Sequence, residues 1–124
     1  MPDPAISYDE PSDTVYVAFA PGVSATGLEL NENILLRVDA AGRRAIGITF
    51  FNYSVLAQQT ELGPRSFPLS GLASLTPEMR ELAVSLLHSA PLREYLATSS
   101  YTPAAGQTVP ITMVQPEKIT PHAA

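Results

Sequence analysis

Apolar and polar residues alternate along the first half of the chain, a pattern typical of strands that bury one face. Short turns rich in Asp, Asn, Ser, Pro and Gly separate the alternating runs. Strands joined by turns of a few residues must be antiparallel, because a parallel pair needs a long crossover. We therefore predict an antiparallel β-meander over residues 5–57, with strands at Ile6–Tyr8, Thr14–Phe19, Leu28–Leu30, Ile34–Asp39 and Ile46–Phe50.

The alternation also predicts which side chains share a face of this sheet. One set points to the core: Val15, Val17, Ile34, Leu36 and Ile48. The other set points away from it: Tyr16, Leu35, Thr49 and Phe51. This second set is too apolar for free exposure, so we expect the C-terminal helix or a partner to cover it. A helix with one apolar stripe covers one sheet face only, and a homodimer is the simplest source of cover for the other.

The second half of the chain has a different pattern. Residues 58–70 carry Gly63-Pro64 and Phe67-Pro68 and are predicted to form a loop. Thr76-Pro77-Glu78 predicts a helix start, with a hydroxyl N-cap, proline at the first position and an acid in the first turn. Apolar residues then recur at helical spacing, so 71–97 is predicted to be a helical segment.

Alternation resumes at Val109, Ile111 and Met113, which predicts that 106–114 returns to the sheet as a strand, with Pro110 facing an edge. Residues 115–124 are predicted to be a frayed tail. The expected fold is α+β in a single domain, 1–124. It has a mainly antiparallel meander sheet of five to six strands, with one amphipathic helix packed on it.

Composition narrows the class of protein. The chain has 124 residues, 45% of them hydrophobic and 15% charged, with a net charge of −5. Its single lysine, Lys118, and its six arginines are scattered, which argues against nucleic acid as a ligand because phosphate binding requires clustered cations. Cysteine is absent, which excludes thiolate metal sites and thiol nucleophiles. We see no signal-peptide pattern and no membrane-length apolar run, so we expect a cytoplasmic protein without membrane contact.

Candidate chemical groups are few. Asp9, Glu10 and Asp13 crowd one turn, and carboxylates can hold a hard cation, but the spacing fits carboxylates that bond their own turn better. His88 follows Ser85 and Glu81 on the polar side of the predicted helix, where side chains splay outward and no oxyanion hole is implied. We assign no catalytic residue, no metal and no cofactor.

The first half also resembles a known family, the small bacterial proteins called domain of unknown function 2283. The resemblance covers Ile6–Ser54, where the motifs keep the order and spacing of that family. They are Tyr8-Asp9, Asp13-Thr14-Val15-Tyr16-Val17, Asp39-Ala40-Ala41-Gly42, Ile46-Gly47-Ile48 and Asn52-Tyr53-Ser54.

The resemblance implies a compact β-meander, a cytoplasmic setting and no established activity. Some relatives are similar in setting to the small partners of toxin-like proteins, which implies protein binding. In this chain Thr49 stands where members of the family carry Glu, so any chemical role of that acid is lost here. The shared motifs consist mainly of turns and core strands, which is typical of a fold signature. Ala40-Ala41-Gly42-Arg43 is interpreted as a hairpin connection, in which Gly42 is free to take a positive φ.

These observations favour a non-enzymatic interaction module that acts through self-association. Binding of another protein is a second role that the same interpretation allows. The predicted contact face is the set Tyr16, Leu35, Thr49 and Phe51. The alternative is a small-ligand-binding protein or an unrecognised enzyme with a pocket between sheet and helix. In that case we expect Tyr16, Arg37 and Tyr95 to supply the polar contacts.

Overall fold

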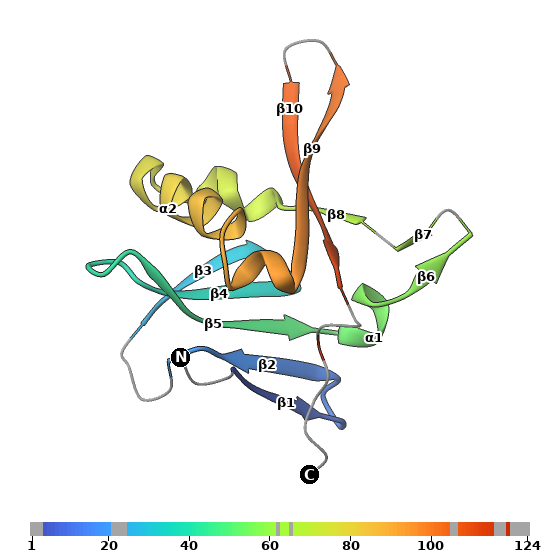
Figure 1. Ribbon diagram of the computed structural model, residues 1–124. Helices are drawn as coiled ribbons and strands as arrows, with labels where there is room; N and C mark the ends of the chain where they lie inside the picture. Colours follow the sequence, from blue (N-terminus) through green and yellow to red (C-terminus); the bar gives the residue numbers. More distant parts are fainter. Residues whose placement is uncertain are drawn as a thin grey trace.

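The computed structural model describes residues 4–20, 25–61, 63–64, 66–104, 107–115 and 119, and its longest helix lies above a large sheet (Figure 1). In chain order the elements are β1 (Ala5–Asp9), β2 (Thr14–Ala18), β3 (Thr26–Asn31), β4 (Ile34–Asp39), β5 (Arg44–Phe51), α1 (Tyr53–Leu56), β6 (Gln59–Thr60), β7 (Gly63–Pro64), β8 (Ser66–Pro68), the 3₁₀ helix η1 (Ser70–Ser74), α2 (Pro77–Leu87), the 3₁₀ helix η2 (Leu92–Glu94), β9 (Leu96–Ala104) and β10 (Gln107–Val114).

The larger sheet contains β1 to β5 in the order β1-β2-β5-β4-β3, and all its neighbouring pairs are antiparallel. The predicted antiparallel strands and the α+β class are therefore confirmed. The strand order differs from a simple meander, however. After β2 the chain passes to the far edge to begin β3, and β4 and β5 then fold back until β5 pairs with β2.

The predicted return of 106–114 to this sheet is wrong. β10 does form there, but it lies between β8 and β9 in a separate three-stranded sheet. The sequence reasoning did not foresee β9, whose small and hydroxyl-bearing residues carry little apolar alternation. Once β9 exists, pairing it with β10 closes a short loop, which costs less chain entropy than reaching the distant sheet.

The interval 58–70 is also more ordered than the predicted loop. β6 pairs with β7, and β8 pairs with β10 through partners such as Phe67 and Thr112. Within 71–97 the helix start at Thr76-Pro77 is confirmed, because the Thr76 hydroxyl accepts a hydrogen bond from the Met79 amide at 3.2 Å. The last two residues of that predicted helical range begin β9 instead.

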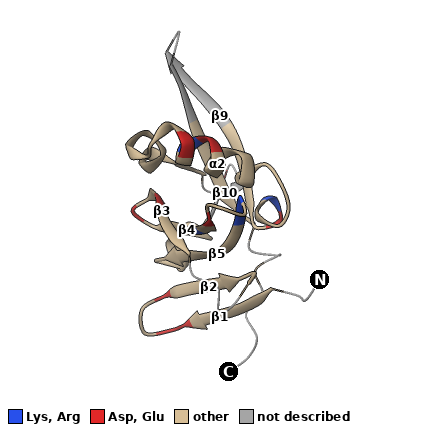
Figure 2. Ribbon diagram, turned by 90° about the vertical axis from the view of Figure 1, so that its left-hand side faces the viewer, with Lys and Arg blue, Asp and Glu red and all other residues tan. Residues whose placement is uncertain are grey.

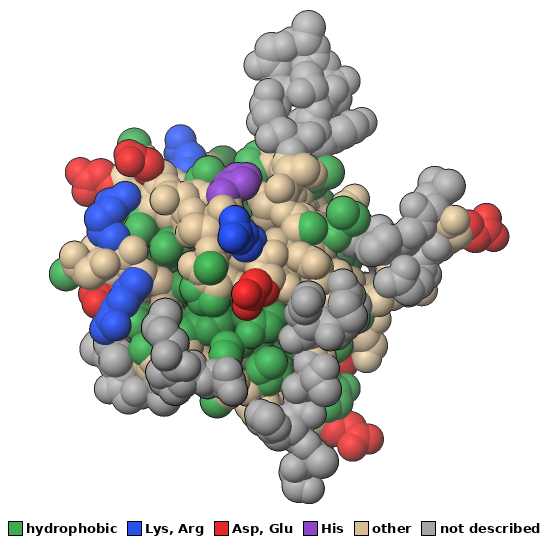
Figure 3. All heavy atoms as spheres, in the orientation of Figure 1, with side chains coloured by type: hydrophobic (Ala, Val, Ile, Leu, Met, Phe, Trp, Pro, Cys, Tyr) green, Lys and Arg blue, Asp and Glu red, His purple; other side chains and the backbone are tan. Residues whose placement is uncertain are grey.

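The core lies between one face of the larger sheet and the elements that follow it. All the residues predicted to point inward are buried: Val15, Val17, Ile34, Leu36 and Ile48. They form one cluster with α2 residues such as Leu82 and Leu87 and with Leu96 of β9. Figure 3 shows apolar side chains reaching the surface over β5 and β2 on the side it presents, whereas charged side chains lie beside α2. Alternation thus predicted the core side of the sheet correctly.

The predicted fraying of 115–124 does not hold where this tail is described. The Gln115 amide donates to the Tyr95 carbonyl at 2.9 Å, and the side chain of Ile119 is only 3% exposed and belongs to the core cluster. The other residues of the tail, including His122, lie outside the described residues. An isolated apolar residue in a polar tail carries no periodicity, so no sequence pattern could place Ile119 in the core.

Replacing Ile48 tests the assignment of faces. Ile48 lies on the central strand and is 1% exposed, so Ile48→Ala should lower the free energy of unfolding by about 2–5 kcal/mol. Arg37→Ala, at an exposed position of the neighbouring β4, is the control and should change it by less than about 0.5 kcal/mol. Urea denaturation followed by circular dichroism measures both. Equal midpoints for the two variants would contradict the assignment.

The edge strand β3 is covered by η1, and the approach is close at Gly71. A Cβ atom on Gly71 would collide with the carbonyl oxygen of Glu29 and lie 2.9 Å from the carbonyl carbon of Leu30. Both obstacles are backbone atoms, which cannot swing aside as a flexible side chain can. Gly71 therefore allows η1 to lie against the edge of the larger sheet.

Gly71→Ala should accordingly destabilise the fold by about 1–3 kcal/mol, because η1 must move away from β3. Gly27→Ala is the matched control, since its Cβ would meet only the Leu35 side chain, at an ordinary contact distance of 3.4 Å. Thermal unfolding of the two variants under the same conditions distinguishes them. A Gly71→Ala protein as stable as Gly27→Ala would show that η1 does not need this approach.

Candidate functional site

The face of the larger sheet that points away from the core carries the predicted contact residues. We call it the second face and define it by Tyr16, Leu35, Arg37, Thr49 and Phe51. Tyr16 and Leu35 lie directly opposite Thr49 on the strands either side of it, so the three form one cross-strand row. Tyr16 is 46% exposed and Phe51 is 38% exposed, whereas Leu35 is half-buried.

Thr49 differs from its neighbours because only 6% of it is exposed. Directly opposed residues of an antiparallel pair have Cβ atoms about 5 Å apart, so Tyr16 and Leu35 flank the shorter threonine on both sides. Glu29 continues the row beyond Leu35, and Ser7 continues it beyond Tyr16. The second face therefore has an aromatic and aliphatic centre with polar residues at its borders.

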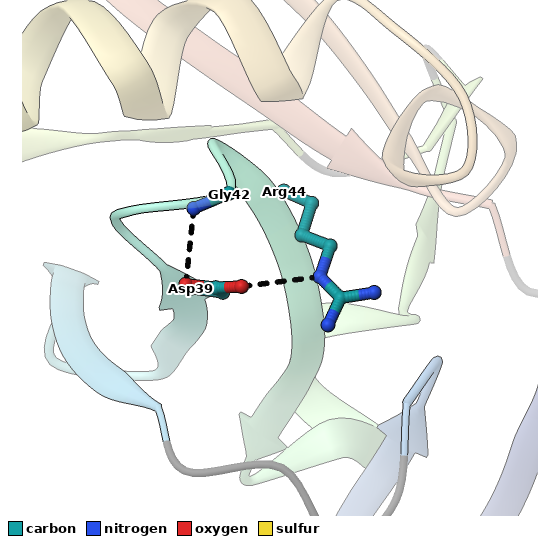
Figure 4. Close-up of polar contacts among 3 residues, drawn as sticks. All are labelled: Asp39, Gly42 and Arg44. Carbon is teal, nitrogen blue, oxygen red and sulfur yellow. Dashed lines mark hydrogen bonds and ion pairs between the residues drawn. The ribbon is translucent and has the colours of Figure 1, made fainter.

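The turn between β4 and β5 is closed by polar contacts of Asp39 (Figure 4). Its carboxylate accepts a hydrogen bond from the Gly42 amide at 3.1 Å and pairs with Arg44 at 3.2 Å. Both contacts favour the ionised form, and together they lower the pKa of Asp39. Gly42 does not use the positive φ that a glycine is free to adopt; Arg43 is the residue with positive φ here, at 51°.

The three residues predicted as ligand contacts do not meet. Tyr16 and Arg37 are exposed on the second face, on strands separated by β5. Tyr95 is 5% exposed and belongs to the core cluster, where its ring centroid lies 5.9 Å from that of Phe19. Tyr95 lies between η2 and β9. A tyrosine ring has enough apolar surface to pack into the core, and the sequence pattern did not distinguish this placement from a polar contact with a ligand.

Two adjoining hollows lie elsewhere, beside β3 and η1. The larger has a volume of about 540 Å³ and is lined by Gly27, Glu29, Asn31, Glu32, Ser70, Gly71, Ser74 and Leu75. The smaller, of about 320 Å³, shares Asn31, Glu32 and Ser70 with it. Neither is lined by Tyr16, Arg37 or Tyr95. The structure therefore separates the predicted ligand contacts from these hollows.

The turn between β1 and β2 holds a compact polar cluster. The Asp9 carboxylate accepts hydrogen bonds from the amide and the hydroxyl of Ser12, as expected for a carboxylate that bonds its own turn. Asp13 reaches further: its carboxylate accepts from the Ser54 amide at 3.0 Å, from the Ser54 hydroxyl at 2.9 Å and from the Tyr8 hydroxyl at 2.8 Å. Asp13 thus ties the first hairpin to the start of α1.

The sequence reasoning missed this link between Asp13 and Ser54, which are 41 residues apart. The signal was present in the family motif, which contains Tyr8, Asp13 and Ser54, but each was assigned to its local turn. The bond to Tyr8 and the bonds to Ser54 stabilise the ionised carboxylate and lower the pKa of Asp13. The same contact raises the pKa of Tyr8, because the phenol donates its proton to a negative group.

The remaining candidates for chemistry lie apart from one another. Within the described part of the chain, no three His, Asp or Glu side chains come together to hold a metal ion. His88 is exposed, and its Nδ1 lies 2.9 Å from the Val84 carbonyl oxygen one turn earlier. Glu81 instead approaches Arg43 of the β4–β5 turn, at 4.0 Å. His88 and Glu81 therefore contact different parts of the protein.

Comparison with known protein families gives a match over the first part of the chain. Residues 5–54 match the family model described as Protein of unknown function (DUF2283). The segment covers 50 of the 124 residues, β1 to β5 and the start of α1, and it contains Asp13, Ser54 and the second face. No curated protein and no solved structure matches the chain. In the described regions, none of the helices combines the length and apolar character needed to cross a bilayer.

The tie made by Asp13 predicts a pH dependence. A folded-state pKa below the ordinary value of 3.8 means that ionised Asp13 stabilises the fold above that pH. This contribution is lost as the pH falls through the folded pKa. Asp13→Asn keeps a residue that tolerates the left-handed backbone there, at φ 52°, but it has no charge to lose.

We therefore expect Asp13→Asn to be less stable than the unsubstituted protein at pH 7. On acidification from about pH 5 to about pH 2, the free energy of unfolding of Asp13→Asn should fall by less than that of the unsubstituted protein. Ser54→Ala removes one donor and keeps the backbone amide, so it should give a smaller change in the same direction. Urea midpoints measured across that pH range test this. Parallel pH profiles for all three proteins would show that Asp13 does not couple folding to protonation.

Proposed function

We propose that the protein is a non-enzymatic, cytoplasmic interaction module that acts through self-association, with a second copy of the chain seated on the second face. The observation that carries this is the exposure of Tyr16 and of Phe51, the last residue of β5, on one face of the sheet. Aromatic side chains bury a large area and lose little rotamer entropy when they are covered, which makes them effective interface residues.

The row on the second face is compatible with a two-fold contact. A two-fold axis parallel to β5 would place β2 of one copy across β4 of the other. Tyr16 would then contact the partner's Leu35, and the reciprocal contact would follow by symmetry. Thr49 is short and lies between these two larger side chains, so it leaves room for them to interdigitate.

The dimensions of the sheet limit the strength of such a contact. Five strands spaced about 4.8 Å apart and roughly six residues long span about 24 Å by 20 Å. Such a face, of about 480 Å², is smaller than the roughly 800 Å² per partner of a standard interface and falls in the range of weak, transient contacts. We therefore expect a dimer that dissociates in the micromolar range, and whose population changes on dilution.

The alternative is a small-ligand-binding protein or an unrecognised enzyme, and its best support is the hollow of about 540 Å³ beside β3 and η1. Its volume falls within the range of ligand sites, roughly 300–1,000 Å³. Its lining, however, includes one large apolar side chain, Leu75, whereas ligand sites are lined predominantly by hydrophobic and aromatic side chains. The second face therefore remains the better supported site.

Phe51→Asp tests the self-association. A carboxylate placed in a shared apolar interface has no partner, so the variant should elute as a monomer at concentrations where the unsubstituted protein is a dimer. Because Phe51 is 38% exposed in one chain, this monomer should remain folded. Light scattering on a size-exclusion column measures the mass, and circular dichroism checks the fold.

Ser85→Asp is the matched control, since it adds the same charge at an exposed position of α2 and should leave the dimer intact. An unsubstituted chain that is monomeric even at millimolar concentration would refute the proposed self-association. A Phe51→Asp protein that stays dimeric would move the contact to another surface.

A further inference from the structure

The two edges of the larger sheet are treated differently by the rest of the chain. At the β3 edge, η1 lies against the outer side of Glu29 and Leu30, as the close approach of Gly71 shows. At the β1 edge, the strand pairs with β2 on one side, and its residues are exposed except for half-buried Ile6. A sheet edge with unpaired amides and carbonyls is a template for another strand.

The register identifies which backbone groups of β1 point outward. The Phe19 amide donates to the Ile46 carbonyl, so Phe19, and with it Val17 and Val15, direct their backbone groups toward β5. Backbone direction alternates along a strand, so Tyr16 and its neighbours face β1 and bond to Ser7, Ala5 and Asp9. The amides and carbonyls of Ile6 and Tyr8 therefore point away from the sheet.

β1 also lacks the features that usually protect an edge. Its pairing with β2 runs through five consecutive partners without a bulge, and the strand contains neither lysine nor proline. Among the described residues, the backbone groups of Ala5–Asp9 make no hydrogen bonds outside the sheet. The edge is therefore flat and regular, which suits the addition of a strand.

The charges at one end of β1 favour one orientation of an added strand. Asp9 and Glu10 are exposed at the C-terminal end of β1, and Figure 2 shows acidic residues, in red, where β1 and β2 meet their connecting turn. An incoming antiparallel strand places its N-terminal end beside this acidic turn. A parallel strand would bring its C-terminal end there instead, and antiparallel pairing is also slightly more stable per residue. The attraction therefore favours an antiparallel strand with a basic N-terminal end.

We propose that the β1 edge binds an extended segment of another polypeptide as an additional antiparallel strand, with Lys or Arg at the end of the segment that lies beside Asp9 and Glu10. Main-chain hydrogen bonds to Ile6 and Tyr8 supply the attachment, and the acidic turn supplies the selectivity. The class of partner is thus an unfolded or terminal segment with alternating apolar residues and a basic start.

A second copy of this chain is a poorer occupant of the edge. An antiparallel pair of β1 strands would place each acidic turn beside the partner's Ala5, and residues 4–8 of that strand carry no Lys or Arg. The charge therefore favours a different polypeptide.

Hydrogen exchange of individual amides tests the site. The probe is a short capped peptide with the sequence Lys-Lys-Val-Thr-Val-Thr, added to the unsubstituted protein and to Phe51→Asp. Before addition, the amides of Ile6 and Tyr8 should exchange fast, whereas those of Ser7 and Asp9 should be protected by β2. On binding, Ile6 and Tyr8 should become protected in both proteins. Use of both proteins makes the result independent of self-association.

Charge selectivity is tested with the same peptide carrying Glu in place of both lysines. The lysine peptide should bind about tenfold more tightly at low salt, and the difference should shrink at high salt. Equal affinity of the two peptides would refute the role of Asp9 and Glu10. Binding without protection of Ile6 and Tyr8, or no binding, would refute the edge site.

Ile6→Pro removes one outward amide and leaves the bonds between β1 and β2 intact, because proline is tolerated where the amide faces outward. It should weaken peptide binding about three- to tenfold relative to Ile6→Ala, which loses the same side chain but keeps the amide. Equal binding by two folded variants would contradict the proposed hydrogen bond. Protection of Ile6 and Tyr8 without peptide, rising with protein concentration in Phe51→Asp, would identify a second copy as the occupant.

Discussion

The structure depends on the burial of β5 between two partners. Six consecutive residues of this strand, 45–50, are buried, and it pairs with β2 on one side and β4 on the other. β2 approaches so closely that a Cβ on Gly47 would lie 2.9 Å from the Val17 carbonyl oxygen. Because Ile48 and Phe50 are held in the core, Thr49 and Phe51 must point to the second face. The core therefore determines which residues that face presents.

The first half of the fold was predictable from its sequence because period-two alternation specifies a face as well as a strand. A slip of one residue would have exposed Ile34, Leu36 and Ile48 together, and all three are buried. The second half lacked such a pattern. β9 is rich in Ser, Thr and Ala, and it forms because β10 pairs with it, while Ile119 joins the core as a single apolar residue. Tertiary partners decide both, and a local pattern cannot identify them.

The candidate surfaces were predictable to different extents for the same reason. The outward direction of Tyr16 and Phe51 follows from alternation, and both are exposed. The burial of Tyr95 depends on Phe19, which lies far away in the sequence. Likewise, Asp13 satisfies its carboxylate with Ser54 across 41 residues, although turn chemistry alone would have kept it local. Contacts between distant segments therefore account for what the sequence did not reveal.

The geometry of a pleated sheet keeps the two proposed contacts from competing. Side chains such as Tyr16 project along the normal to the sheet, whereas the free amides and carbonyls of Ile6 and Tyr8 lie in its plane. A copy seated on the second face and a segment paired with β1 would therefore approach from perpendicular directions. Asp13 bonds to Tyr8 and to Ser54, so it holds the edge strand and the start of α1 in one rigid unit. A segment bound at the edge would then extend the same sheet that carries the proposed self-association face, so the two proposed contacts would use separate surfaces of one sheet.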